Sequence, residues 1–136
     1  MAAFSPAESI MTALASKIAA SAFYTSIGQR IAVDRIAADL VLPCCVYSMQ
    51  KFDAQNYMGG SIRYEGLVDF TIYDSCKTGT AALHSLATSL YTGLGGSYTV
   101  SNLDRMTVTR VSTGTPSFED EAWSIIERYR VVSFKV

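Results

Sequence analysis

The sequence predicts an α+β fold: a mixed, mostly antiparallel β-sheet with two helices packed on one face and two long projecting loops. A long segment of alternating apolar and polar residues predicts a strand at residues 61–74, and a second long strand is predicted at residues 123–136. Two further segments carry apolar residues at helical spacing and predict the helices. The order helix, short strand, hairpin, helix, hairpin is typical of a helix layer on an antiparallel sheet.

The segment SIRYEGLVDFTIYD at 61–74 has the strongest of these patterns. One face of the predicted strand is apolar and carries Ile62, Tyr64, Val68, Phe70 and Ile72. The alternate residues are mostly charged or polar, because successive side chains of a strand point to opposite sides. At about 3.3 Å per residue the strand would be roughly 40 Å long, about twice the usual length. We therefore expect it at the centre of the sheet, with the helices against its apolar face.

The first helix has a clear predicted start. Ser5 can cap the free N–H groups, Pro6 suits the first helical position, and Glu8 completes a capping box. The amphipathic pattern then continues to about Phe23. A short strand is predicted at Ile31–Arg35.

The remaining elements follow from strand-forming residues, turn residues and helical spacing. In chain order they are a strand at 44–49, a loop at 50–60, a helix that begins at Ser75 or Thr80 and ends at the glycines of 93–96, a strand at 105–111, a loop at 112–121 and the final strand. The sequence does not decide between the two helix starts.

Composition narrows the class of protein. We expect residues 1–136 to form a single domain. Hydrophobic residues make up 49% and charged residues 17%, so either a partner covers apolar surface or alanine inflates the apolar count. The net charge of −1 gives no reason to expect nucleic-acid affinity. No apolar run approaches the roughly 20 residues that span a bilayer, and no secretory leader is recognisable. We expect no membrane association and an intracellular site of synthesis.

The reactive residue types do not form a recognisable site. Cys44, Cys45 and Cys76 are too few for a disulfide framework, and we expect reduced thiols packed as small hydrophobic groups. His84, the single histidine, lies off the apolar stripe of its helix, where solvent exposure is expected. The consecutive acids of 119–121 lack the alternating spacing of a calcium loop. We predict no enzymatic activity, no cofactor and no metal.

The two predicted loops carry the residues that we expect at an interface. They are Lys51, Phe52, Tyr57 and Met58 in the first loop, and Phe118, Glu119, Asp120 and Glu121 in the second. Two long strands, two long loops and an apolar surplus are typical of a protein that assembles with copies of itself. A head-to-tail contact repeated by rotation closes a ring. The alternative is that these loops contact no partner.

Several segments together carry a resemblance to a known family. They are the alanine-rich helix at 10–23, the segment at 31–35, LPCCVY at 42–47, the charged and aromatic strand at 63–73, and IERYRV at 126–131. In this order the chain resembles the tail terminator (tail-completion, tail-to-head joining) proteins of long-tailed bacteriophages. The likeness is one of pattern and order over nearly the whole chain. It departs from the family at Cys44-Cys45, where an aromatic residue is commoner.

The resemblance implies a structural virion protein without catalysis or cofactor. It implies a hexameric ring that caps the head-proximal end of the tail tube, ends tube polymerisation and offers a docking face to the capsid neck. The implied partners are copies of the chain, the tail tube protein and a neck or head-closure protein, with DNA passing through the lumen unbound. Assembly would take place in the cytoplasm of the host bacterium. The alternatives are a head-closure or connector adaptor ring, a tail tube subunit, or a small enzyme or ligand-binding α+β domain.

Overall fold

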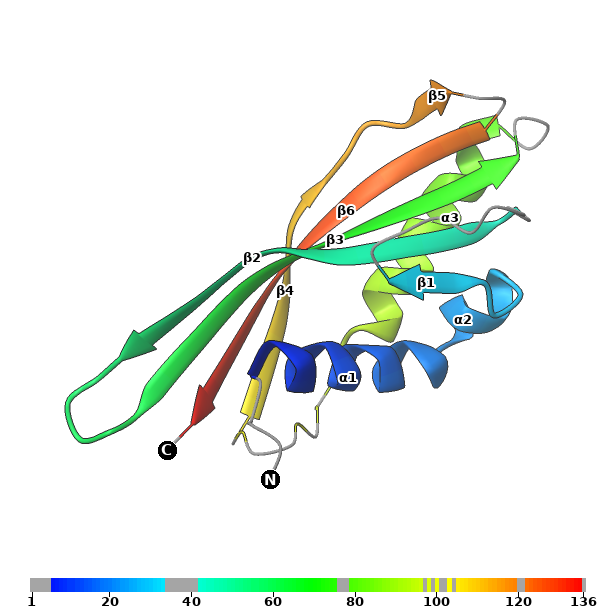
Figure 1. Ribbon diagram of the computed structural model, residues 1–136. Coiled ribbons are helices and arrows are strands. Elements are labelled where there is room, and N and C mark those ends of the chain that lie inside the picture. Colours follow the sequence, from blue (N-terminus) through cyan, green and yellow to red (C-terminus); the bar gives the residue numbers. More distant parts are fainter. Residues whose placement is uncertain are drawn as a thin grey trace.

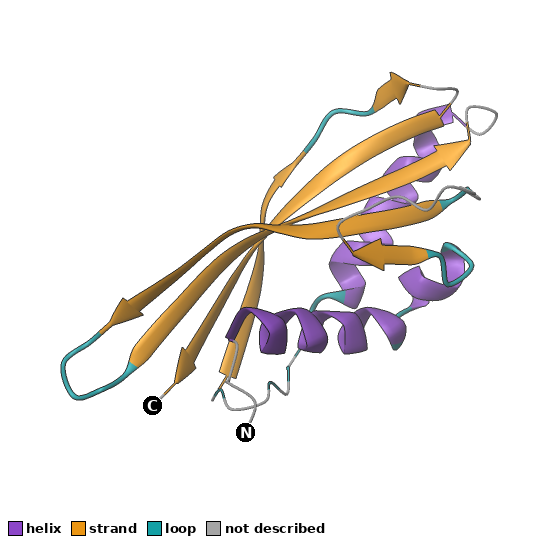
Figure 2. Cartoon of the chain, in the orientation of Figure 1, coloured by secondary structure: helices purple, strands orange, loops and turns teal. Residues whose placement is uncertain are grey.

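The computed structural model describes residues 6–33, 42–75, 79–96, 98, 100, 103, 105–119 and 122–135. In this part of the chain, six strands form one twisted sheet, and three helices lie on one of its faces (Figure 1, Figure 2). The helices are α1 (Pro6–Ala19), α2 (Ala22–Ser26) and α3 (Gly79–Gly93). The strands are β1 (Ile31–Val33), β2 (Cys44–Asn56), β3 (Ile62–Ser75), β4 (Arg105–Thr113), β5 (Ser117–Glu119) and β6 (Ala122–Lys135).

The sheet has the order β1-β2-β3-β6-β4, and β5 also pairs with β6. The β1–β2 pair is parallel, and the other pairs are antiparallel. The predicted α+β class is therefore confirmed. The long strand predicted at 61–74 is β3, and it lies at the centre between β2 and β6 as expected.

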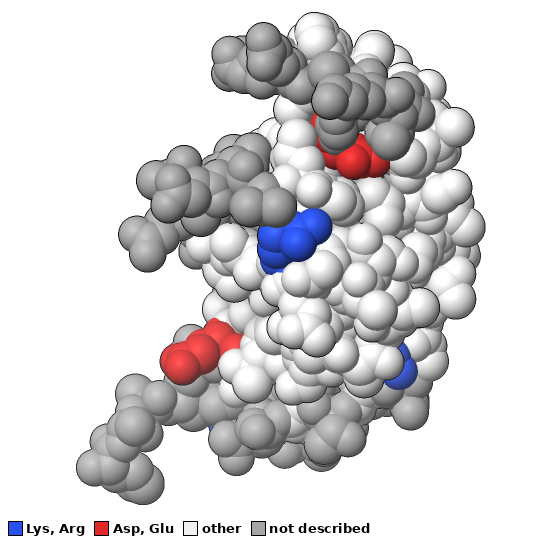
Figure 3. All heavy atoms as spheres, turned by 90° about the vertical axis from the view of Figure 1, so that its right-hand side faces the viewer, with Lys and Arg blue, Asp and Glu red and all other residues white. Residues whose placement is uncertain are grey.

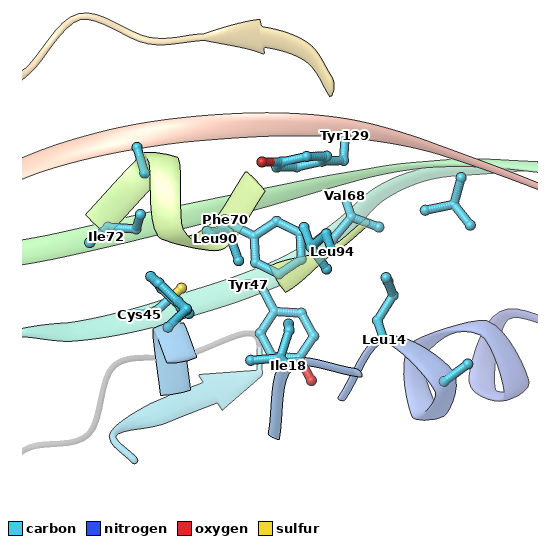
Figure 4. Close-up of a cluster of buried hydrophobic side chains, with 14 of the residues drawn as sticks. Leu14, Ile18, Cys45, Tyr47, Val68, Phe70, Ile72, Leu90, Leu94 and Tyr129 are labelled. Atoms are coloured by element: carbon cyan, nitrogen blue, oxygen red, sulfur yellow. The ribbon is translucent and has the colours of Figure 1, made fainter. Parts of the chain in front are cut away.

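The inner face of the sheet forms the core with the helices. Phe70 and Ile72 are fully buried, and apolar residues of α1 and α3 belong to the same cluster. The Phe70 ring stacks on Tyr47 of β2 at 5.2 Å between centroids and meets Tyr129 of β6 edge-on at 5.5 Å (Figure 4). Such aromatic pairs add to the stability that burial of apolar area gives. The period of two in the sequence thus corresponds to burial on one face of the sheet.

The first predicted helix is interrupted, so the described part of the chain has three helices where the sequence predicts two. α1 ends at Ala19, and the hydroxyl of Ser21 donates to the carbonyl oxygen of Ile18 at 2.6 Å. A serine side chain that bonds to a nearby carbonyl competes with the helical pattern. The chain restarts as α2 at Ala22, which leaves Phe23 fully buried. The predicted cap at Ser5 lies outside the described residues.

The prediction of a long loop at 50–60 is wrong. β2 continues to Asn56 in register with β3, and the reversal occupies only Tyr57–Ser61. The N–H of Tyr57 donates to the carbonyl oxygen of Ser61 at 2.8 Å, and Gly59 and Gly60 have positive φ. Glycine adopts this conformation without steric cost. The first projecting loop is therefore the far half of a β-hairpin.

The loop predicted at 112–121 is also partly strand. Ser112 and Thr113 belong to β4, and 117–119 form β5 beside the start of β6. The N–H of Gly114 donates to the carbonyl oxygen of Ile126 at 2.7 Å, which holds the intervening turn against the sheet. The predicted residues Asp120 and Glu121, and the end of the predicted strand 31–35, lie outside the described residues.

Candidate assembly interface

The sheet divides at one row of residues. The register slips in β2 between Met49 and Lys51, and in β4 between Arg110 and Ser112. Both bulges flank the same row, in which Val68 of β3 pairs with Tyr129 of β6. Bulges bend a strand and increase its twist. Figure 1 shows the strands twisting sharply at the middle of the sheet and then spreading apart.

We call the two halves the body and the arm. The arm consists of β2 and β3 from Lys51 to Leu67, β4 from Arg105 to Arg110, and β6 from Arg130 to Lys135. The body is the rest of the sheet with the helices. The tip of the β2–β3 hairpin extends beyond the helices (Figure 1). From Asp53 to Gly60 every residue is exposed, so this part of the arm has both faces available for contact.

The base of the arm is held by two stacked rings. Phe52 lies opposite Gly66 in the register, and its ring stacks on Tyr64 at 5.7 Å and 13°. A Cβ atom at residue 66 would lie 3.4 Å from the carbonyl oxygen of Lys51 and 3.4 Å from the Met49 side chain. The space above this glycine is therefore taken up by the Met49 side chain and the backbone of β2. Phe52, predicted as an exposed contact residue, is half-buried and stabilises the arm itself.

The outer face of the sheet, opposite the helices, carries paired charges. Arg128 donates to both oxygens of Asp69, directly opposite in the register, at 2.7 and 3.1 Å. Glu65 accepts a hydrogen bond from Arg63 at 2.7 Å and forms an ion pair with Nε of Arg130 at 3.0 Å. Figure 3, which views the end of the molecule near α2 and β1, shows mostly uncharged residues there. On the outer face, by contrast, three arginines share two carboxylates, so most of the charge there is paired.

Of the predicted interface residues, three lie on the exposed surface of the arm. Lys51 pairs with Asp53 at 3.4 Å, and both side chains are about two-thirds exposed. Tyr57 and Met58 lie in the turn at the tip, with 44% and 100% of their surface exposed. The hydroxyl of Tyr57 donates to Gln55 at 3.2 Å. The tip thus exposes the whole Met58 side chain and part of the Tyr57 side chain.

The second predicted set lies at the other end of the sheet. Phe118 in β5 packs against Trp123 at 5.2 Å between ring centroids and is half-exposed. Glu119 pairs through its backbone with Ala122, whereas the arm corresponds to the opposite end of β6. The structure therefore does not bring the two predicted sets into one surface.

Sequence reasoning missed the two open edges of the arm. β1 pairs only with Cys45–Tyr47, so in the described part of the chain no strand lies beside the outer edge of Lys51–Asn56. The outer edge of Arg105–Arg110 in β4 is open in the same sense. An open edge is a template for pairing with another strand, because its outward N–H and C=O groups have no strand partner. These edges could have been found only by predicting the long hairpin. The polar residues of 50–56 predict a loop instead.

The residue types that perform chemistry are placed without a recognisable reaction centre. His84 lies exposed on α3. Cys44 and Cys45 are buried free thiols, as predicted, and burial raises the pKa of both, which makes them unreactive at neutral pH. Cys76 lies outside the described residues. In the described ranges, no three His, Cys, Asp or Glu side chains are grouped so that they could hold a metal ion. None of the helices described has the length and apolar character that a membrane crossing needs.

Comparison with known proteins identifies the fold. No protein-family model matches the chain, and no curated protein matches it in sequence. The structure is similar to a chain from the virion of a native gene transfer agent particle, with a TM-score of 0.66 and 14% identity, covering 96% of this chain and 98% of that one. A second solved structure, whose name states no function, has a TM-score of 0.70 and 12% identity over 96% of both chains. The chain therefore shares its whole fold with a component of a gene transfer agent virion.

Proposed function

We propose that the chain is a structural protein of a phage-like virion that forms a ring, six copies in all, at the head-proximal end of a tail tube. The likeness to a gene transfer agent virion chain, over 96% of the residues, is the observation that carries the virion assignment. The order of segments, which resembles that of tail terminators, supports the position at the tail. In this role the ring ends tube polymerisation, docks to the neck and needs no cofactor or catalysis.

The two open edges of the arm support assembly into a ring. Three antiparallel pairings separate β2 from β4, so these two strands run in opposite directions. Rotation about an axis along the strands preserves their direction, so β4 of one copy would meet β2 of the next as an antiparallel neighbour. Each edge offers six residues between its bulge and the end of the arm, Lys51–Asn56 and Arg105–Arg110. Such a contact is heterologous, and its repetition closes a ring.

The strength of one such contact is modest. The register that keeps the outer faces of both strands on the same side joins about five residue pairs, which form about five backbone hydrogen bonds with a net gain of about 1 kcal/mol each. Association itself costs roughly 4–15 kcal/mol of lost freedom. A single edge contact is therefore marginal, and ring closure or a preformed end of the tail tube must add to it. We expect assembly to depend strongly on protein concentration or on the tube.

The two ends of the sheet suit two different partners. The arm tip with Tyr57 and Met58 lies at one end, and Phe118 with Trp123 lies at the other. A ring between a tube and a neck needs a contact surface on each side. We propose that one of these apolar ends contacts the tail tube protein and the other the neck or head-closure protein.

Passage of DNA requires a surface that does not hold the phosphate backbone. On the outer face of the sheet, Arg128 pairs with Asp69, and Arg63 and Arg130 share Glu65. Paired cations release fewer counterions from DNA and therefore bind it more weakly than free ones. We propose that this face lines the lumen and lets DNA pass unbound.

The experiment that tests the ring is native mass measurement with variants of one edge. We expect wild-type protein, alone or with tail tubes of the same virus, to form rings of one copy number. T107D combined with T109D places acids on the outer face of β4, where the proposed pairing brings one of them opposite Asp53 of the next copy, and like charges across paired strands are destabilising. This double variant should remain monomeric, and added D53K should restore the ring. S112D, on the body side of the bulge, is the matched control and should assemble as wild type. Wild-type protein that neither forms rings nor binds tube ends would contradict the proposal.

A further inference from the structure

A buried carboxyl group lies directly behind the bulge of β4. Glu127 of β6 has an ionisable side chain but no exposed surface, because it lies among apolar residues on the inner face of the sheet. Its Oε2 accepts a hydrogen bond from the hydroxyl of Thr113 at 3.0 Å and lies 3.6 Å from Nη1 of Arg110. Arg110 and Thr113 lie on the two sides of the β4 bulge. One carboxylate oxygen thus holds both ends of the irregular segment.

The arginine of this cluster also reaches the helix layer. The guanidinium of Arg110 lies over the ring of Tyr91 on α3, 4.2 Å from its centroid. A cation at this distance over an aromatic face is attracted to it. The chain of contacts therefore runs from β6 through the β4 bulge to α3. It joins the body to the strand that forms one open edge of the arm.

Stability alone does not explain a carboxyl group at this place. Removing a charge from water costs several kcal/mol, and a well-packed apolar side chain in the same place is often at least as stabilising as a buried ion pair. Within the described residues, the second oxygen of Glu127 and the hydroxyl of Tyr129 have no hydrogen-bond partner. The carboxyl group instead fixes the course of β4, because it holds the Arg110 guanidinium and the Thr113 hydroxyl at one point.

We infer that Glu127 is a positioning residue that fixes the bend of β4 between body and arm, and thereby the direction of the open β4 edge. The bend itself belongs to the single chain. Only its consequence, correct alignment with the next copy, rests on the proposed function. The partner class is thus a β-strand of a second copy, and Glu127 sets the angle at which β4 presents its edge to that strand.

The protonation state of Glu127 should control this bend. The groups that act on its carboxyl are Arg110 and Thr113 from β4 and His84 from α3, and Tyr129 is its neighbour on β6. The charged carboxylate attracts Arg110 and accepts from Thr113, whereas the neutral acid loses the attraction to the guanidinium. We therefore expect the bend to be held most firmly at a pH above the pKa of Glu127. Global stability should change in the opposite sense, because burial disfavours the charged form.

Amide hydrogen exchange of the monomer tests the inference without any ring. In E127Q the exchange of amides at 110–113, relative to those of β3, should rise about fivefold, the equivalent of one hydrogen bond. The relative protection of these amides should rise with pH in the wild type and become flat in E127Q, after correction for intrinsic exchange. A role in stability alone would slow or speed exchange in β3 and β4 together.

Two further variants keep the test decisive if E127Q unfolds. T113V removes one donor at the surface of the sheet and should raise β4 exchange in the same way. D53N is the matched control, because it removes an acid on the far edge of the arm, and it should leave the amide exchange of β4 unchanged. The inference would be overturned if the amides at 110–113, relative to those of β3, exchanged in both E127Q and T113V as they do in the wild type. If E127Q does not fold, the same result in T113V alone would overturn it. Failure of ring formation would instead count against the proposed function and leave this result standing.

Discussion

The body and the arm are built from the same strands but are stabilised differently. In the body, Phe70 and Ile72 of β3 are fully buried beneath the helices. In the arm, the Phe52–Tyr64 stack covers the base, and from Asp53 onward β2 is exposed. The comparison teaches that one long hairpin can supply a core at one end and a contact surface at the other. The bulges of β2 and β4 mark the boundary between the two.

The largest effect is expected in the body. F70A removes a ring that packs against Tyr47 and Tyr129, and the cavity should cost about 3–5 kcal/mol of the free energy of unfolding. Urea denaturation measures this cost. A loss below about 1 kcal/mol would show that the body does not carry the stability of the fold.

The matching change in the arm should be smaller and local. F52A removes the half-buried ring opposite Gly66, and we expect a loss of about 1–2 kcal/mol. Hydrogen exchange should rise at 51–67 in the arm and remain as in the wild type in α3. Equal changes in both halves would contradict the division into body and arm.

The buried acid at the boundary gives a pH dependence. Burial raises the pKa of Glu127 above its value in the unfolded chain, and Thr113 and Arg110 oppose that shift only in part. The contribution of the group to stability is therefore complete below the unfolded pKa and is lost as the pH rises through the folded pKa. E127Q should remove this decline. Urea unfolding from pH 4 to pH 8 measures it, and identical slopes in both proteins would contradict the assignment.

The paired charges should affect DNA binding more than stability. E65Q with D69N frees Arg63, Arg128 and Arg130 on the outer face, so the affinity for a short DNA duplex should rise. This affinity should decrease steeply as the salt concentration increases. Fluorescence anisotropy measures the affinity, with D53N as a control elsewhere on the arm. Firm DNA binding by the wild type, or no gain in the double variant, would exclude this face as a neutral lining.

The smallest effect on stability is expected at the tip. M58S changes a fully exposed side chain, and the free energy of unfolding should stay within about 0.5 kcal/mol of the wild type. Binding to tail tubes or to the neck should weaken if the tip contacts either. Measurement of both properties separates a contact residue from a structural one.

The sequence predicts most of the body because one-sided burial leaves a clear period. In β3 and β6 the alternation of apolar and polar residues corresponds to the inner and outer faces, and parity alone places Glu127 on the inner face with Tyr129. From Asp53 onward β2 has no such period, since both of its faces are exposed, which is why the sequence predicts a loop there. The break at Ser21 depends on one hydroxyl bond, and the bulges depend on cross-strand register. Neither leaves a pattern along the chain.

The most direct test of the central claim is disulfide cross-linking between copies. Cysteine placed at residue 51, 53 or 55 of one copy should link to cysteine placed at residue 107 of another, because the open edge of β2 is proposed to pair with that of β4. T107C mixed with K51C, D53C or Q55C should give a covalent dimer at one of these positions, and S112C should not. Absence of a link from all three positions, in protein that forms rings, would contradict pairing of the arm edges.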